Sequence, residues 1–183
     1  MRPLNDWATT GAYTGEFKQI PPGGYVCRIL DAKVENGGFG EQLVLKLDVI
    51  EGEYKGFFAS RSAEMRTFVM TKDNATNPFF KGVITAIEES NPGYAFTATW
   101  DERTLIDKPV GVLFREEEYL NKYDELCTAT RAFACRSVKT IHDGVPVPQK
   151  RKLRPEQRRR AQAASSDHER GFTEVPEDEQ LPF

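Results

Sequence analysis

The sequence predicts a mainly β domain over residues 23–145, preceded by an N-terminal arm (1–22) and followed by a disordered C-terminal tail. Three observations predict this class. Apolar residues recur with period two along 43–49, while Val44, Lys46 and Asp48 point to the other face, as on a half-buried strand. Further short apolar segments are bounded by Gly and Pro. One stretch, 79–87, has the apolar spacing of a helix instead.

The first two strands are marked by clear breakers. Residues 21–24 (Pro-Pro-Gly-Gly) precede a strand over 25–34, and the glycines of 37–40 predict a turn or flexible loop. In the second strand, one face carries apolar residues and the other carries Lys46. The apolar residues are Leu43, Leu45, Leu47 and Val49.

The remaining elements follow in order. The turn at 52–56 leads into a third strand over 57–61, and Asn77-Pro78 is a helix start that places Pro in the first turn. The helix has its apolar face on Phe79, Phe80, Val83, Ile84 and Ile87. Residues 91–93 (Asn-Pro-Gly) end it, and two more strands are predicted over 108–115 and 131–141.

Five short strands with a helix between the third and fourth describe the OB-fold, a small, partly open Greek-key barrel. The alternative is another small α+β domain with the same element order.

A resemblance agrees with this fold. Tyr25, the glycine loop at 37–40, the alternating leucines and residues 51–56 (Glu-Gly-Glu-Tyr-Lys-Gly) resemble a family of phage and mobile-element proteins, and residues 80–89 resemble its helix. That family is encoded among replication and recombination genes. The resemblance covers roughly residues 20–145, and it implies the fold more than an activity.

The net charge of −3 is unevenly distributed. Residues 150–160 hold seven Lys and Arg against Glu156, a net charge of +6, whereas the acids from Glu174 onward give −4. Blocks of like charge and low hydrophobicity predict disorder from about residue 146, with a basic and polar linker over 146–173. The basic block could collect phosphates, act as a solubilising linker or fold back on the acidic end.

The last ten residues, 174–183, form an acidic tip. Such a tip can bind a partner protein. The terminal aromatic ring enters an apolar pocket, the terminal carboxylate meets a basic rim, and the acids steer the approach. The tip resembles that of bacterial and phage single-stranded DNA-binding proteins, although Gln180 replaces an acid. The resemblance implies that replication or recombination enzymes bind Glu177, Asp178, Glu179, Leu181, Pro182 and Phe183. The alternative is an acidic tail that ends in Phe by chance.

A single-stranded DNA site needs cations for phosphates and aromatic rings for bases. The candidates are Lys46, Lys55, Phe57, Phe58, Arg61, Arg66, Arg115, Tyr119, Arg131, Phe133, Arg136 and Lys139. Some have simpler explanations. Phe57 and Phe58 would point to opposite faces of a strand, Phe133 and Tyr25 could be core residues, and the cations could form a solvated face.

Other functions have weaker support. The sequence lacks common nucleotide-binding, hydrolase and metalloprotease motifs, so we expect no catalysis and no cofactor. The acids at 116–118 leave a metal-dependent nuclease as a remote alternative. Cys27, Cys127 and Cys135 have no metal-type spacing and suit a reducing compartment. No stretch suits a signal peptide or membrane span, which predicts a protein of the bacterial host cytoplasm.

We therefore expect non-catalytic binding and protection of single-stranded DNA in phage or mobile-element replication, recombination or repair, with partner enzymes recruited through the tip. The alternative is a protein-interaction adaptor, or recombination accessory factor, whose OB-fold does not bind DNA. The sequence leaves homo-oligomerisation and preference for DNA or RNA open.

Overall fold

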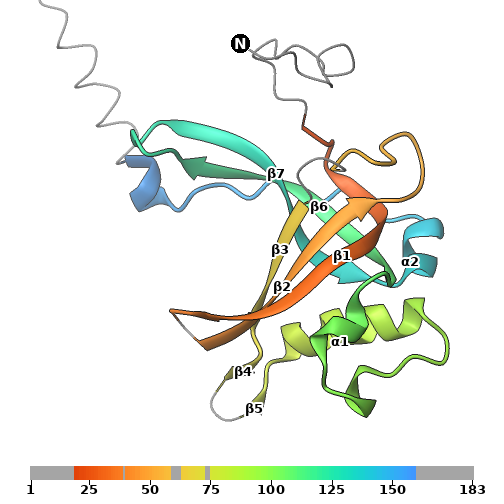
Figure 1. Ribbon diagram of the computed structural model, residues 1–183. Helices are drawn as coiled ribbons and strands as arrows, with labels where there is room; N and C mark the ends of the chain where they lie inside the picture. Colours follow the sequence, from red (N-terminus) through yellow and green to blue (C-terminus); the bar gives the residue numbers. More distant parts are fainter. Residues whose placement is uncertain (1–18, 39, 59–62, 73–74, 160–183) are drawn as a thin grey trace, which may run out of the picture.

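The computed structural model describes residues 19–38, 40–58, 63–72 and 75–159, without the side chains of 66–69 and 72 (Figure 1). Five antiparallel strands form the main sheet in the order β3-β2-β1-β6-β7. Their bounds are β1 (Gly23–Gly37), β2 (Gly40–Val49), β3 (Ala63–Val69), β6 (Pro109–Leu120) and β7 (Leu126–Arg136). A second, short ladder joins β4 (Thr71–Lys72) to β5 (Ala75–Thr76). The predicted mainly β fold is confirmed.

Strand β1 belongs to both halves of the sheet. Its residues 27–37 pair with β2, and its first six residues pair with β6. A register shift between Ile29 and Asp31 interrupts the ladder with β2, and such a bulge bends a strand and increases its twist. The sheet curls far enough for β3 to contact β7, where Cys135 Sγ lies 3.9 Å from Met65 Sδ. No ladder joins these two strands within the described residues, so the sheet is not closed.

The core confirms the leucine stripe predicted for β2, although Val44 on the opposite face is buried as well. Leu43, Leu45 and Leu47 are buried with Val49, while Lys46 on the opposite face is half-buried. Burying each such leucine stabilises the fold by about 1.5–3 kcal/mol. This stripe therefore determines which face of the sheet points inward.

The third strand lies later in the sequence than predicted. Phe57 and Phe58 lie in a turn, not in a strand, and residues 59–62 lie outside the described residues. The Asp48 carboxylate accepts hydrogen bonds from the backbone N–H groups of Val49 (2.9 Å) and Phe58 (2.8 Å). These bonds hold the chain in a loop after β2. The next strand, β3, begins at residue 63.

Helix α1 (Pro78–Ser90) begins and ends as predicted. The Asn77 side chain accepts a hydrogen bond from the Phe79 N–H (3.0 Å), which is the usual N-cap arrangement. The residues facing the core are Phe80, Val83, Ile84, Ala86 and Ile87. Phe79 was predicted on this face but is 65% exposed, because it lies on the solvent side of the first turn. Two short 3-10 helices follow, η1 (Phe96–Ala98) and η2 (Glu102–Leu105).

The last predicted strand is wrong in its second half. Strand β7 ends at Arg136, and α2 (Val138–His142) follows it. The Ser137 hydroxyl accepts a hydrogen bond from the Thr140 N–H, which starts the helix despite the β-branched residues in it. Ile141 packs against Gly111. A Cβ atom added at Gly111 would lie 2.4 Å from the Cγ1 atom of Ile141. Close packing of this kind accepts only glycine there.

Residues 146–159 differ from the disordered linker that the sequence predicts. Arg151 forms a parallel bridge with Glu117 of β6, and residues 155–159 are helical. Carboxylates on β6 provide partners for this basic segment, which composition alone does not reveal. The N-terminal residues 1–18 and the tail from 160, including the whole acidic tip, lie outside the described residues.

Candidate nucleic-acid interface

The β6–β7 hairpin extends beyond the body of the sheet and presents two different faces (Figure 1). Arg115 pairs in register with Arg131, and Tyr119 pairs with Cys127. Because side chains alternate along a strand, Arg115, Tyr119 and Arg131 share one face. Phe133 follows Arg131 by two residues and therefore lies on the same face, with its ring under the Arg115 guanidinium. We call these four residues the aromatic face.

Cations and rings lie in contact on this face. The Arg115 guanidinium carbon lies 4.2 Å from the centre of the Phe133 ring, and that of Arg131 lies 5.3 Å from the Tyr119 ring. Such contacts contribute about 0.5–1 kcal/mol at exposed sites. They hold rings next to positive charge, which is the combination that bases and phosphates need.

The turn of the hairpin carries a further pair. Lys122 Nζ lies 4.8 Å from the centre of the Tyr123 ring, and that ring is 66% exposed. The Asn121 side chain accepts hydrogen bonds from the N–H groups of Tyr123 (2.8 Å) and Glu125 (3.0 Å). These bonds order the turn as an Asx-type motif. The sequence analysis missed Tyr123, although an aromatic residue two positions after Asn in a short polar turn is a signal that the sequence shows.

Both edges of the hairpin are covered. The Gln19 side-chain amide donates to the Thr128 carbonyl (3.0 Å) and accepts from the Thr130 N–H (2.8 Å), so it replaces a neighbouring strand beside β7. On the other edge, the Arg151 backbone bonds to Glu116 and Glu118 of β6. Covered edges resist pairing with other strands. The face of the hairpin, and not its edge, is therefore the surface available for binding.

The opposite face of the hairpin carries carboxylates. Glu118, whose side chain is only 8% exposed, accepts hydrogen bonds from Arg158 Nη2 (2.7 Å) and the Leu153 N–H (3.1 Å). Lys150 Nζ lies 3.8 Å from both Glu116 and Glu118. The basic segment 150–159 is thus held by the acids at 116–118. The sequence analysis considered those acids only for a remote nuclease alternative and did not pair them with the basic block.

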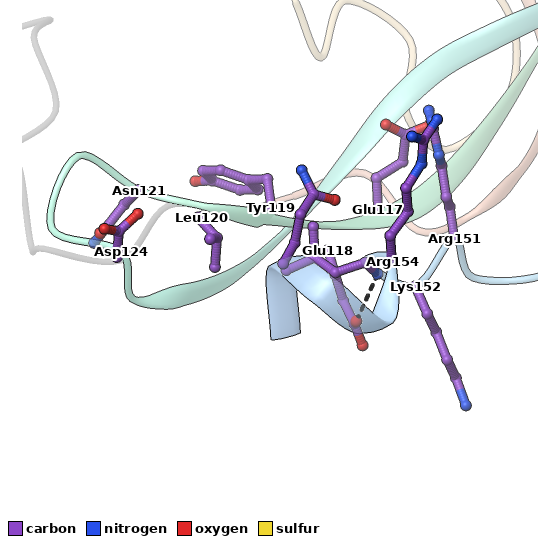
Figure 2. Close-up of a pocket in the computed structure, with 11 residues that line it drawn as sticks. Glu117, Glu118, Tyr119, Leu120, Asn121, Asp124, Arg151, Lys152 and Arg154 are labelled. Atoms are coloured by element: carbon purple, nitrogen blue, oxygen red, sulfur yellow. Dashed lines mark hydrogen bonds and ion pairs between the residues drawn. The ribbon is translucent and has the colours of Figure 1, made fainter. Parts of the chain in front are cut away.

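The hydrogen bond from Arg158, followed by that from the Leu153 N–H, holds the pKa of the Glu118 carboxyl below its usual value. Between the segment and β6 lies an open groove of about 480 Å³ (Figure 2). Figure 2 shows the Glu118 carboxylate reaching the backbone of the segment, while the Lys152 side chain extends away from the groove. Arg158 is therefore neutralised by a close carboxylate, whereas Lys152 extends away from the acids of β6.

Charge on the aromatic face is also partly balanced. Glu117 lies 2.7 Å from Arg115 Nη2 and 3.7 Å from Arg151 Nη1. Arg131 is exposed and stacks on Tyr119, and no carboxylate among the described residues is paired with it. Arg131 is thus the cation of this face best placed to meet a phosphate.

Other predicted site residues lie apart from this face. Lys46 lies on β2, 3.8 Å from Asp31, and Lys55 lies in the loop after β2. Arg136 lines a separate groove between α1 and the start of α2, whereas Lys139 lies on α2 instead of the last strand. Arg61 and the side chain of Arg66 lie outside the described residues.

Phe57 and Phe58 join an aromatic cluster against the core. Their ring centres are 5.0 Å apart, and Phe58 stacks on the buried Phe114 at 5.7 Å. Tyr25 meets Phe114 edge-on at 5.7 Å, and burial raises its pKa. Both Phe rings therefore contribute to packing, because the loop folds them inward, and neither lies beside the aromatic face.

Among the described residues, no group of His, Cys, Asp and Glu side chains has an arrangement that could hold a metal ion. No helix in the same part of the chain has both the length and the apolar character needed to cross a membrane.

Comparison with known proteins does not identify the chain. No protein-family model and no curated protein matches the sequence.

Proposed function

We propose that the chain is a non-catalytic single-stranded DNA-binding protein built on an OB-type barrel. The observation that carries this proposal is the aromatic face of the β6–β7 hairpin, where two guanidinium groups lie against two rings. Bases stack on rings at about 1–3 kcal/mol each, and this stacking is tolerant of sequence. Such a surface suits a nucleic-acid strand whose bases are unpaired.

The arrangement of the strands supports the barrel. The order β3-β2-β1-β6-β7 is the order obtained by opening a five-stranded barrel between its third and fifth strands. The two edge strands are in contact, and α1 lies between β3 and β6 in the chain. In OB-folds, the loops after strands one and four flank the bound oligonucleotide. The corresponding hairpins, β1–β2 and β6–β7, project on the same side (Figure 1).

The biological setting rests on the two resemblances. The body resembles phage and mobile-element proteins encoded with replication and recombination genes, and the tip resembles that of single-stranded DNA-binding proteins. We propose that the barrel protects single strands in a bacterial host cell while residues 174–183 recruit a replication, recombination or repair enzyme. Neither a cofactor nor a membrane enters this role.

A second candidate is an adaptor whose barrel does not bind DNA. It is favoured by the number of cations already next to carboxylates: Lys46 by Asp31, Arg115 by Glu117, and Arg158 by Glu118. In that case only the tip would have a binding function.

Titration of labelled oligo-dT at about 50 and 200 mM salt separates the two candidates, because each phosphate contact contributes about −0.7 to the slope of log K against log salt for a single strand. We expect submicromolar binding at low salt and a steep loss at high salt. The absence of binding at low salt would favour the adaptor.

Deletion of Phe183 tests the tip separately. In a partner pocket, the ring is the energetic anchor and the acids set the encounter rate. We expect the deletion to abolish capture of a replication or recombination enzyme and to leave oligo-dT affinity nearly unchanged. Capture that survives the deletion would make the resemblance of the tip accidental.

A further inference from the structure

The basic segment 150–159 contacts β6 through a small number of strong interactions. Two backbone hydrogen bonds flank Arg151, to the Glu116 carbonyl (2.8 Å) and from the Glu118 N–H (2.9 Å). Arg158 forms the one close ion pair, at 2.7 Å from Glu118. These contacts, with the hydrogen bond from Leu153, are what fixes the position of the segment.

The other ion pairs are longer. Lys150 lies 3.8 Å from each of its two carboxylates, and Arg151 Nη1 lies 3.7 Å from Glu117 with its side chain 60% exposed. Pairs of this kind contribute about 0–1 kcal/mol and are screened by salt. A stronger polyanion can compete for these cations and for Arg158, which leaves the three hydrogen bonds of Arg151 and Leu153 as the contacts that still resist release.

The acids on β6 meet the segment from both faces of the strand. Because side chains alternate along a strand that rises by about 3.3 Å per residue, Glu116 and Glu118 share one face and Glu117 points to the other. Glu116 and Glu118 lie near Lys150, Glu118 bonds to Arg158, and Glu117 lies near Arg151, so three negative charges contact the segment as phosphates would. A longer phosphate chain offers the same segment more charge.

Release of the segment needs no change in the sheet. Residues 143–150 contain no helix or strand, and they connect the segment to α2. Glu118 is covered by the segment itself, so its carboxylate becomes hydrated when the segment leaves. This avoids the large penalty of an unpaired buried charge.

We propose that the acids at 116–118 are an internal substitute for phosphate, and that a phosphate-chain ligand displaces them from the basic segment. The free segment then adds the cations Lys150, Arg151 and Arg158 to the ligand-binding surface. This inference concerns the segment alone and does not rest on stacking of bases on the aromatic face.

Inorganic polyphosphate is a suitable probe because it has no bases. Hydrogen exchange of the full-length protein is measured at low salt, with and without polyphosphate, at the backbone N–H groups of Arg151, Leu153 and Glu118. We expect polyphosphate to reduce protection of all three while the β1–β2 ladder stays protected. Unchanged protection of the three groups at millimolar polyphosphate would overturn the proposal.

A pair of charge-matched variants gives a second measurement. Glu118→Gln removes the anchor for Arg158, whereas Glu41→Gln removes the same charge from β2, away from the segment. If the segment is free in about one molecule in ten, the affinity of Glu118→Gln for polyphosphate rises by up to about tenfold. We expect a change below about twofold in Glu41→Gln. Equal changes in the two variants would mean that only overall charge matters.

The failure of this proposal is distinguishable from failure of DNA binding. Polyphosphate that leaves the segment in place would contradict the displacement, even if oligo-dT binds through the aromatic face. Displacement by polyphosphate without any affinity for oligo-dT would sustain the displacement and contradict the proposed function.

Discussion

The two long hairpins of the sheet have the same antiparallel backbone but different exposed chemistry. On β1–β2, charged side chains neutralise one another: Lys33 pairs with Glu35, and Lys46 lies 3.8 Å from Asp31. Among residues 30–38 and 40–46 there is no aromatic side chain. On β6–β7, guanidinium groups lie on rings instead. Over the described residues of the two hairpins, β6–β7 therefore offers stacking platforms, whereas β1–β2 offers balanced charge.

Removal of the rings should have the largest effect. We expect Tyr119→Ala combined with Phe133→Ala to weaken oligo-dT binding by at least about 30-fold, since each stacked base contributes about 1–3 kcal/mol. Leu30→Ala combined with Val34→Ala removes exposed apolar groups from β1–β2 and should change affinity by less than about twofold. Equal losses in the two double variants, measured by fluorescence anisotropy, would remove the distinction between the hairpins.

Removal of single cations should give a smaller, salt-dependent effect. Arg131→Ala should make the slope of log K against log salt shallower by about 0.7, because one phosphate contact is lost. Lys46→Ala should leave the slope nearly unchanged, since Asp31 already balances this lysine. Titrations at four or more salt concentrations measure both slopes. A larger change for Lys46→Ala would move the phosphate path to β1–β2.

Acid should release the basic segment from β6. The pKa of Glu118 is lowered in the folded protein by Arg158 and by the Leu153 N–H, with Lys150 nearby. The ionised Glu118 carboxylate therefore stabilises the docked segment at pH values above the ordinary Glu pKa of about 4.3. This stabilisation is lost as the pH falls through the lowered pKa that Glu118 has in the folded protein. Exchange protection of the Arg151 N–H, corrected for intrinsic rates, should fall in this range. A Glu118→Gln variant should show no such transition, and an identical transition in it would assign the effect to other groups.

The smallest effect is expected from a variant far from both hairpins. Asn77→Ala removes the N-cap of α1 and should lower the free energy of unfolding by about 1 kcal/mol. Oligo-dT affinity should stay within error of the unmodified protein. A parallel loss of affinity, measured beside urea unfolding, would mean that the losses in the hairpin variants report stability instead of contacts.

The sequence predicts regular elements better than their ends. The leucine stripe of β2 and the Asn77-Pro78 start of α1 are local patterns, and both are confirmed. The third strand is displaced because Phe57 and Phe58 have high β propensity but are folded into a loop by Asp48. The β-branched residues of α2 likewise favour a strand, but the Ser137 hydroxyl caps a helix there by accepting a hydrogen bond from the Thr140 N–H. Residue propensities do not include such a cap.

The candidate site is predictable only in part. Sequence reasoning named Arg115, Tyr119, Arg131 and Phe133, and the structure brings these four to one face. Alternation along β7 already places Arg131 and Phe133 on one face, but the sequence does not show the pairing with β6 that brings Arg115 over the Phe133 ring. The contact between the acids at 116–118 and the basic segment joins residues more than 30 positions apart. Complementary charge suggests such a contact but does not specify its partners.

The most direct test of the central claim is ultraviolet cross-linking of oligo-dT to the full-length protein, followed by peptide mapping. The account predicts cross-links on the β6–β7 hairpin, at Tyr119, Tyr123 or Phe133, which disappear when unlabelled oligo-dT competes. The exposed Trp100, on the loop between η1 and η2, serves as an internal control and should stay unmodified. Cross-links confined to β1–β2, or equally strong at Trp100, would contradict the assignment of the aromatic face as the surface that binds DNA.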